Sequence, residues 1–273
     1  GRIIKDIIAL IKSTIEKRNL IIDLAKSDFK RRFVGSYFGV AWMFVQPMVT
    51  VLIYFLVFQM GFKSTPPIPD TPYVLWLIPA IVPWFYFSEI LTTGTNCLKE
   101  YDYLVKKVVF NVEILPMIKL VSSAIVHVIF ILIMIAMFLL QGRLPMLSWL
   151  QIAYYSFALS MYSLAIVYIC AAVNVFFKDM AQIVSIALQF GMWATPIMWS
   201  PDIFPQAPAW IDKVLKVNPL YYIVVGYRDS MLQGNAFWQR PILGLYFWAV
   251  TLSLFWLSIR IFNKLKVHFS DVL

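Results

Sequence analysis

Six long apolar stretches dominate this chain of 273 residues. A helix needs about 20 mainly apolar residues to cross the hydrocarbon core of a bilayer, because each residue adds only about 1.5 Å. Stretches of that length predict six membrane-spanning helices, at 38–60, 73–93, 114–140, 149–173, 180–199 and 242–261. Pro79 and Pro83 interrupt the second of them. We therefore expect an all-α membrane protein with six transmembrane helices.

The small number of charged residues excludes a soluble enzyme. Only 14% of the residues are charged and 61% are hydrophobic, whereas a soluble domain carries about 25% charged residues. The net charge of +9 would suggest nucleic acid in a soluble protein, but in a membrane protein Lys and Arg report orientation. Sixteen of them lie in 1–37, 94–113, 174–179 and 260–273, against six in 61–72, 141–148 and 200–241. This excess predicts that both termini are cytoplasmic, and we expect no nucleic-acid partner.

The spans divide the chain into three parts. Residues 1–37 form a cytoplasmic interface segment, 38–261 form the transmembrane domain, and 262–273 form a cytoplasmic tail. Ile4, Ile8, Ile11 and Ile15 recur at helical spacing, which predicts an amphipathic helix lying on the membrane surface. No cleavable signal peptide is expected in residues 1–18, because charged and apolar positions alternate there.

Basic residues gather where the interface segment meets the first span. Lys30, Arg31 and Arg32 are consecutive. One interpretation is anchoring on anionic lipid, as positively charged cytoplasmic segments commonly do. The other is a docking site for a substrate linked to a lipid phosphate.

The cytoplasmic loop 94–113 has mixed charges and two tyrosines. Its central residues are Lys99, Glu100, Tyr101, Asp102 and Tyr103. This composition suits a short helix that presses on a soluble partner, and it equally suits a solvated loop.

The chain lacks the residues of several kinds of active site. It has no G-x-x-x-x-G-K-[ST] phosphate loop, and its only histidines, His127 and His268, are too few for a histidine-based metal site. We therefore expect neither a metal nor a cofactor in this chain. Ion-coupled carriers place several ionisable groups at mid-membrane, and here Glu89 is the main candidate. It is either a functional carboxylate or an acid held by a neighbouring helix.

Aromatic residues in the first two predicted spans are the main positive evidence about function. Trp42, Tyr54 and Phe58 lie in the first span, and four consecutive aromatics, residues 84–87, lie in the second. Four consecutive side chains spread around the whole circumference of a helix, so some of Trp84, Phe85, Tyr86 and Phe87 must point inward. Aromatic faces pack against sugar rings and isoprenoid chains. The run therefore predicts an aromatic-lined path, with ordinary packing or an interfacial belt as the alternative.

The segment 200–240 contains two apolar pieces too short to cross a bilayer. A proline-rich turn at 200–208 precedes a short helix at 210–217 and another at 220–232. We expect these helices to be re-entrant or to lie at the outer surface. They would cap the outer mouth of a pathway, with Tyr221 and Tyr222 at the water boundary.

Several motifs resemble one known family. They are Gly35-Ser-Tyr-Phe-Gly-Val-Ala-Trp42 with Gln46-Pro47, Asn174-Val-Phe-Phe-Lys-Asp179, Thr195-Pro196-Ile197 with Pro205, and Asn218-Pro219-Leu-Tyr-Tyr-Ile. In order and spacing they resemble the transmembrane subunits of ABC-2 type polysaccharide and polyol phosphate export permeases. The stretches 218–228, 246–250 and 268–273 look most like wall teichoic acid permeases.

The resemblance implies a transporter subunit in a bacterial inner membrane, which is not itself an enzyme. Two copies would pair into a pore, and two separate ATPase subunits would hold ATP and Mg²⁺. The cargo would be a glycopolymer on an undecaprenyl pyrophosphate carrier, with wall teichoic acid favoured. The alternative cargoes are O-antigen or capsular polysaccharide. A further alternative is an exporter of drugs or lipids. A membrane-embedded transferase is a rival from another class, but the sequence supplies no convincing acidic, His or Arg cluster at one membrane face.

On this interpretation, each set of candidate residues has a role. The pyrophosphate would enter at Lys30, Arg31 and Arg32. The polymer would pass along the aromatic residues, Glu89, Tyr221 and Tyr222. The N-terminal segment, including Asp28, and the loop residues Lys99 to Tyr103 would couple the spans to the ATPase.

Overall fold

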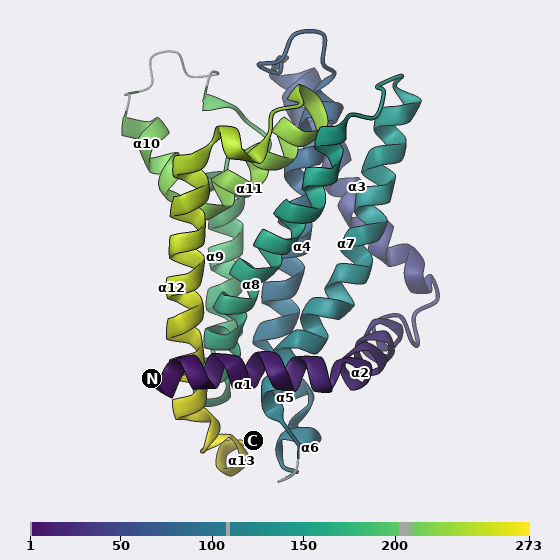
Figure 1. The fold of residues 1–273 in the computed structure, drawn as a ribbon. Coiled ribbons are helices and arrows are strands. Elements are labelled where there is room, and N and C mark those ends of the chain that lie inside the picture. Colours follow the sequence, from purple (N-terminus) through teal and green to yellow (C-terminus); the bar gives the residue numbers. More distant parts are fainter. Residues whose placement is uncertain (1, 108–109, 202–207, 209) are drawn as a thin grey trace.

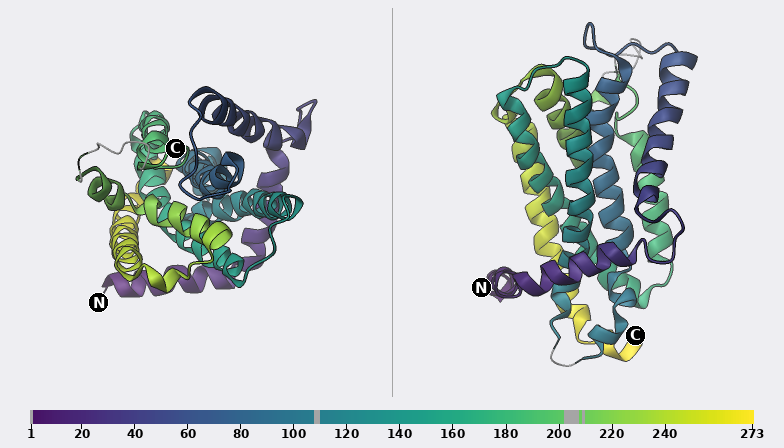
Figure 2. Two further views of the ribbon diagram at one scale, coloured as in Figure 1. Left: turned by 90° about the horizontal axis from the view of Figure 1, so that it is seen from above. Right: turned by 90° about the vertical axis from the view of Figure 1, so that its right-hand side faces the viewer.

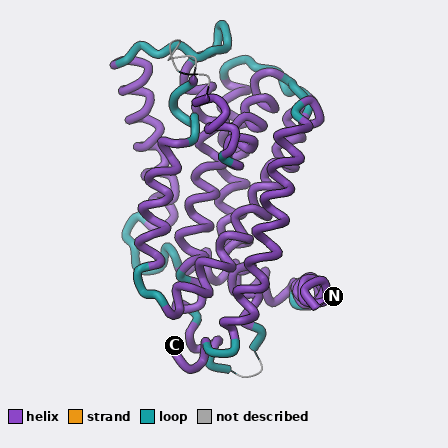
Figure 3. Tube along the Cα trace, turned by 90° about the vertical axis from the view of Figure 1, so that its left-hand side faces the viewer, coloured by secondary structure: helices purple, strands orange, loops and turns teal. Residues whose placement is uncertain are grey.

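The structure is a computed structural model that describes residues 2–107, 110–201, 208 and 210–273, with the backbone alone at 2–6. Throughout this described part the chain forms helices and loops, without strands (Figure 3). The predicted all-α class is therefore confirmed.

Five helical segments among the described residues are long and apolar enough to cross a membrane. They pack side by side into one bundle (Figure 1), and each overlaps a predicted span. The segments are η1 Gly39–Ala41, α3 Trp42–Tyr54 and η2 Phe55–Gly61; α4 Tyr73–Thr95; η3 Val112–Ile114 with α7 Leu115–Leu140; η4 Leu147–Leu150 with α8 Gln151–Phe176; and α12 Pro241–Lys266. Pro79 and Pro83 lie inside α4, which continues past both.

The helix expected at 180–199 is shorter than predicted. α9 runs from Met180 to Ala194, 15 residues, below the length that a straight span needs. Thr195 is extended (φ −99°, ψ 132°) because it precedes Pro196, whose ring disfavours helical backbone at the residue before it.

Short helices close the end of the bundle opposite the two termini (Figure 1). They are α10 Trp210–Val217, α11 Pro219–Arg228, the π-helical turn η6 Asp229–Gln233 and the 3₁₀ turn η7 Phe237–Gln239. The Asn218 side chain caps α11 by accepting a hydrogen bond from the Leu220 amide at 3.0 Å. The proline-rich turn predicted at 200–208 falls largely outside the described residues.

The other end of the bundle carries the N-terminal helices. α1 Arg2–Glu16 lies across the bundle axis, and α2 Arg18–Arg31 runs at an angle to α1 (Figure 2). Ile8, Ile11 and Ile15 are exposed along one face of α1, whereas Leu10 is buried. The predicted position of Ile4 falls among the side chains that are not described. α5 Cys97–Glu100, α6 Asp102–Val105 and α13 Phe269–Val272 complete this end.

Close helix packing depends on small residues. Apolar side chains gain little by leaving lipid for protein, so helices in a membrane are held mainly by close contact. Gly94 of α4 faces α8, where an added Cβ would lie 2.6 Å from Val167 Cγ1. Gly226 of α11 packs directly on the ring of Tyr155 of α8, and a Cβ there would overlap the ring.

Candidate functional site

A groove between α3, α4 and α7 is the first candidate site. Its half nearest α2 has a volume of about 460 Å³ and mixes polar and aromatic side chains. The residues that line this polar half are Arg32, Phe33, Trp42, Met43, Gln46, Pro47, Thr50, Phe85, Ser88, Glu89, Thr92, Thr93, Val126 and Phe130. Arg32 belongs to the predicted phosphate-entry residues, and Trp42, Phe85 and Glu89 belong to the predicted substrate path, so the fold brings residues from two predicted sets to one place.

The groove continues as an apolar half of about 390 Å³. Pro47, Phe85 and Phe130 border both halves, and the remaining lining of the apolar half is aliphatic or aromatic. α3 stands at the edge of the bundle and has no buried residue (Figure 2). The two halves share three lining residues, so the lining of the groove changes from polar to apolar along its length.

An ion cluster adjoins the polar half of the groove. Lys119 of α7 lies 2.6 Å from the Asp28 carboxylate of α2 and 2.7 Å from the Glu100 carboxylate of α5. Arg32 bridges Asp28, at 3.2 Å, and Glu89 of α4. The chain of ion pairs Glu89, Arg32, Asp28, Lys119 and Glu100 thus joins the groove to the loop at 94–113.

Asp28 is the centre of this cluster and is only 2% exposed. The Tyr101 hydroxyl also donates to its Oδ1, at 2.9 Å. Burial by itself raises the pKa of the Asp28 carboxyl, but the hydrogen bond and charge of Lys119 outweigh burial and hold that pKa below its ordinary value. The buried Asp28 carboxylate therefore depends on the Lys119 ammonium to stay charged.

The loop residues predicted to meet an ATPase divide into buried and exposed groups. Tyr101 is buried, whereas Tyr103 is 49% exposed. Glu100 pairs with Lys119 while its side chain stays 45% exposed, and Lys99 donates to the Asn174 side chain at 3.1 Å. Asp102 pairs with Lys106 at 3.4 Å. Residues 108 and 109 of the predicted loop fall outside the described part.

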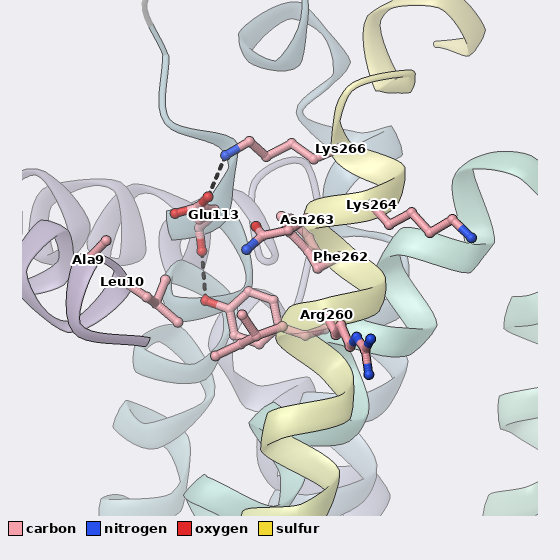
Figure 4. A pocket seen from close by; sticks show the side chains of 10 residues that line it. Ala9, Leu10, Glu113, Arg260, Phe262, Asn263, Lys264 and Lys266 are labelled. Atoms are coloured by element: carbon pink, nitrogen blue, oxygen red, sulfur yellow. Dashed lines mark hydrogen bonds and ion pairs between the residues drawn. The ribbon is translucent and has the colours of Figure 1, made fainter. Parts of the chain in front are cut away.

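A second cavity, of about 580 Å³, lies between α1 and the end of α12 (Figure 4). Lys266 pairs with Glu113 there, and the Tyr168 hydroxyl donates to the Glu113 carbonyl at 2.7 Å. Arg260 and Lys264 also line it, but in Figure 4 their side chains point away from the Lys266–Glu113 pair. The cavity therefore has no convergent set of cations.

The four consecutive aromatics of α4 have different surroundings. Phe85 borders the groove, whereas Trp84, Tyr86 and Phe87 are buried. Tyr86 stacks on His127 with ring centroids 4.1 Å apart, and Phe87 stacks on Tyr162. Burial of these three rings corresponds to the packing alternative, because tight contacts with neighbouring helices leave no open path beside them.

Aromatics elsewhere also lie in packed positions. Tyr54 and Phe58 form a ring cluster with Tyr73 of α4. Tyr221 is half-buried, and Tyr222 is buried, with its hydroxyl 3.1 Å from that of Tyr154. The expectation that Tyr222 lies at a water boundary is wrong, because α11 packs into the bundle.

The fold also uses residues that sequence reasoning missed. Lys119 lies near the start of the third predicted span, and in the structure it is 2% exposed and doubly paired. Its position inside an apolar stretch was the available signal, since a buried ammonium requires a partner. Arg228 is likewise buried and donates to the carbonyls of Trp76, Pro196 and Ile197.

The three predicted phosphate-entry residues have different surroundings. Lys30 and Arg31 are exposed, whereas Arg32 pairs with Asp28 and Glu89.

The described residues hold no group of three or more His, Cys, Asp or Glu residues arranged to bind a metal ion. The acids of the ion cluster are neutralised by Arg32 and Lys119 instead. This site therefore offers ion pairs and hydrogen bonds among its described residues.

Comparison with known proteins identifies the family of this chain. The family model described as ABC-2 type transporter matches residues 20–232. An O-antigen export system permease protein RfbA from Klebsiella pneumoniae is 27% identical over 256 residues, covering 93% of this chain and 95% of the relative. A permease of the same name from Myxococcus xanthus is 26% identical over 266 residues, covering 97% and 99%. The polysaccharide-permease resemblance is thereby confirmed, and this multi-pass membrane chain belongs to the ABC-2 type transporter family.

Proposed function

We propose that this chain is the membrane subunit of an ATP-driven exporter that moves a lipid-linked O-antigen-type polysaccharide across a bacterial inner membrane. Two Klebsiella pneumoniae relatives and one from Myxococcus xanthus are named as O-antigen export permeases. O-antigen therefore replaces wall teichoic acid as the favoured cargo. An undecaprenyl pyrophosphate carrier remains part of the proposal on the strength of the family resemblance.

The observation that carries the proposed mechanism is the ion cluster. It connects Glu89, at the groove, with Glu100, on the exposed loop, through Arg32 and the buried pair of Asp28 and Lys119. A separate ATPase holding ATP and Mg²⁺ would push on this loop, chiefly at Lys99, Glu100, Asp102 and Tyr103. Asp28 and Tyr101 are buried, so they would transmit the movement to α2 instead of touching the ATPase. Ion pairs suit this role because their partners can exchange without unfolding a helix.

Six crossings, with both termini cytoplasmic, form part of the proposal. In Figure 1, α8 ends at the end of the bundle that carries both termini, and α12 begins at the other end. The intervening chain, including α9, would supply the sixth crossing. α10 and α11 would then lie on the outer side, with α11 entering the bundle as a re-entrant helix.

A homodimer is the proposed assembly. α9 has Phe190 75% exposed and Trp193 59% exposed, and the apolar side chains of α3 are exposed along most of its length. Faces of this kind are covered either by lipid or by another protein helix. A second copy of the chain, set against α3 and α9, would enclose a pathway between the two subunits.

Reconstitution tests this proposal directly. The chain and its ATPase subunit would be placed together in inside-out vesicles, with lipid-linked O-polysaccharide in the outer leaflet. We expect ATP-dependent protection of the polysaccharide from an added glycosidase. Transport that persists without the ATPase would identify an ion-coupled carrier, and stimulation of the ATPase only by small amphiphiles would identify a drug or lipid exporter.

A further inference from the structure

One face of α12 carries a mostly apolar stripe that ends in two cations. The apolar part is a shallow groove of about 430 Å³, lined by Tyr246, Ala249, Val250, Ser253, Leu254 and Leu257. Residues three or four apart are neighbours on one face of a helix, and this spacing continues from Leu257 to Arg260 and Lys264. The two cations therefore stand on the groove face, at the end of α12 that lies near both termini (Figure 1).

These two cations have no acid of their own. Arg260 and Lys264 are exposed, and neither pairs with an acidic side chain that the structure describes. In Figure 4 both leave α12 on the side away from the pair of Lys266 and Glu113. The Arg260 guanidinium lies 5.1 Å from the centroid of the Trp256 ring. This contact holds the guanidinium in place and leaves its N–H groups available to an anion.

The position of α1 sets the depth of the cations in the membrane. Leu10 of α1 and Ile259 of α12 line the same cavity, so α1 crosses the bundle at the level of these turns of α12. Ile8, Ile11 and Ile15 are exposed on α1, and an amphipathic helix of this kind lies where hydrocarbon meets lipid headgroups. The two cations therefore lie at headgroup level.

The length of the groove fits one leaflet. From Leu257 back to Tyr246 the helix rises about 16 Å, at about 1.5 Å per residue. Half of the hydrocarbon core of a bilayer is about 15 Å thick. A hydrocarbon chain whose headgroup lies at the cations can therefore follow the groove across its own leaflet.

We propose that this face of α12 binds an anionic phospholipid of the surrounding membrane, with its phosphate between Arg260 and Lys264 and an acyl chain along the groove. Each Lys or Arg at the membrane surface attracts anionic lipid, and here two of them end an apolar stripe. α12 stands across the bundle from α3, on whose side the groove of α3, α4 and α7 lies (Figure 2). The lipid is therefore a resident partner of the fold, a role that goes beyond the proposed function and does not depend on the cargo.

Photocrosslinking tests the inference on the permease–ATPase complex in phosphatidylcholine nanodiscs. Two probes carry the same diazirine-labelled acyl chain, one on phosphatidylglycerol, which is anionic, and the other on phosphatidylcholine, which has no net charge. We expect phosphatidylglycerol to label the α12 peptide containing residues 246–257 saturably and about tenfold more than phosphatidylcholine does. Equal labelling by the two probes, or preferential labelling of other helices alone, would overturn the proposal.

A charge-removing variant tests the two cations. Arg260→Gln/Lys264→Gln should lower phosphatidylglycerol labelling of this peptide to the phosphatidylcholine level, a loss of about tenfold or about 1.4 kcal/mol. Labelling by phosphatidylcholine should stay unchanged, because both side chains are exposed and their replacement leaves the packing of α12 intact. Unchanged labelling by phosphatidylglycerol would contradict the assignment, and so would an equal fall with both probes.

Arg18→Gln/Lys26→Gln is the matched control. Both residues are exposed on α2, so this variant removes the same two kinds of cation from the same end of the bundle. It should keep the tenfold preference for phosphatidylglycerol at α12. A loss as large as that of Arg260→Gln/Lys264→Gln would mean that the overall charge of this end attracts the lipid, and the site on α12 would be rejected.

Discussion

Lys119 and Asp28 lie 91 residues apart in the sequence and 2.6 Å apart in the structure. Both are 2% exposed, so each would cost several kcal/mol to bury alone. Their mutual attraction and the contacts with Glu100 and Tyr101 offset that cost. At the residue scale, this pair holds α2 against α7.

Replacing Lys119 alone should therefore strongly destabilise the folded protein. Lys119→Met leaves the Asp28 carboxylate buried without its ammonium, which costs about 3–5 kcal/mol. We expect a large drop in the thermal unfolding temperature of the detergent-purified protein.

The double variant Asp28→Asn/Lys119→Met is the control for this experiment. It removes both charges but keeps an acceptor for the Tyr101 hydroxyl, so it should recover at least half of the lost stability. A double variant as unstable as Lys119→Met would show that the pair is not the cause.

Acid should weaken the same contact. The pKa of Asp28 in the folded protein lies below its ordinary value of 3.8, so its contribution to the free energy of unfolding is complete above that value and is lost as pH falls below it. Thermal unfolding between pH 6 and pH 3 should show this loss in the wild type. The Asp28→Asn/Lys119→Met variant should show a smaller loss, and an equal loss would contradict the assignment.

At the element scale, α11 owes its place in the bundle to one glycine. Gly226 packs on the Tyr155 ring of α8, and this contact brings the helix in from the bundle end. The neighbouring Tyr222 and Tyr227 are consequently buried. A side chain at position 226 would push α11 outward.

Gly226→Ala should accordingly destabilise the protein by about 1–3 kcal/mol, the usual effect of overpacking, and lower the thermal unfolding temperature. Gly61→Ala is the matched control, since a Cβ there would make an ordinary 3.6 Å contact with the Leu56 carbonyl oxygen. Similar unfolding temperatures for the two variants would mean that α11 moves aside without loss of stability.

At the scale of the whole molecule, both termini lie at one end of the bundle (Figure 1). Which side of the membrane they face can be tested with single cysteines, because the native thiols are poor targets. Cys97 and Cys170 are buried, and burial raises the pKa of the Cys97 thiol to about 12.

Cysteine introduced at Ser270 should react with a membrane-impermeant maleimide in inside-out vesicles and be protected in intact spheroplasts. Cysteine at Leu144, an exposed residue of the loop after α7, should show the opposite pattern. Reaction of both positions from the same side would contradict the proposed topology.

Pairing of two copies can be tested in the same background. Cysteine at Phe190 of α9 should cross-link between subunits with a short bifunctional maleimide in native membranes. Cysteine at Leu132 of α7, which is also exposed, should not. Cross-linking at Leu132 alone would place the dimer interface on another face.

The sequence by itself determined the helices, because a backbone in lipid must satisfy its own hydrogen bonds and apolar runs of about 20 residues can do so only as helices. Five predicted spans have counterparts in the structure. Tertiary structure alone decided which side chains meet. Glu89 pairs with Arg32 across 57 residues of sequence, and three of four consecutive aromatics turn into the core. Such contacts depend on how helices distant in sequence pack together, and the spacing of residues along the chain does not predict them.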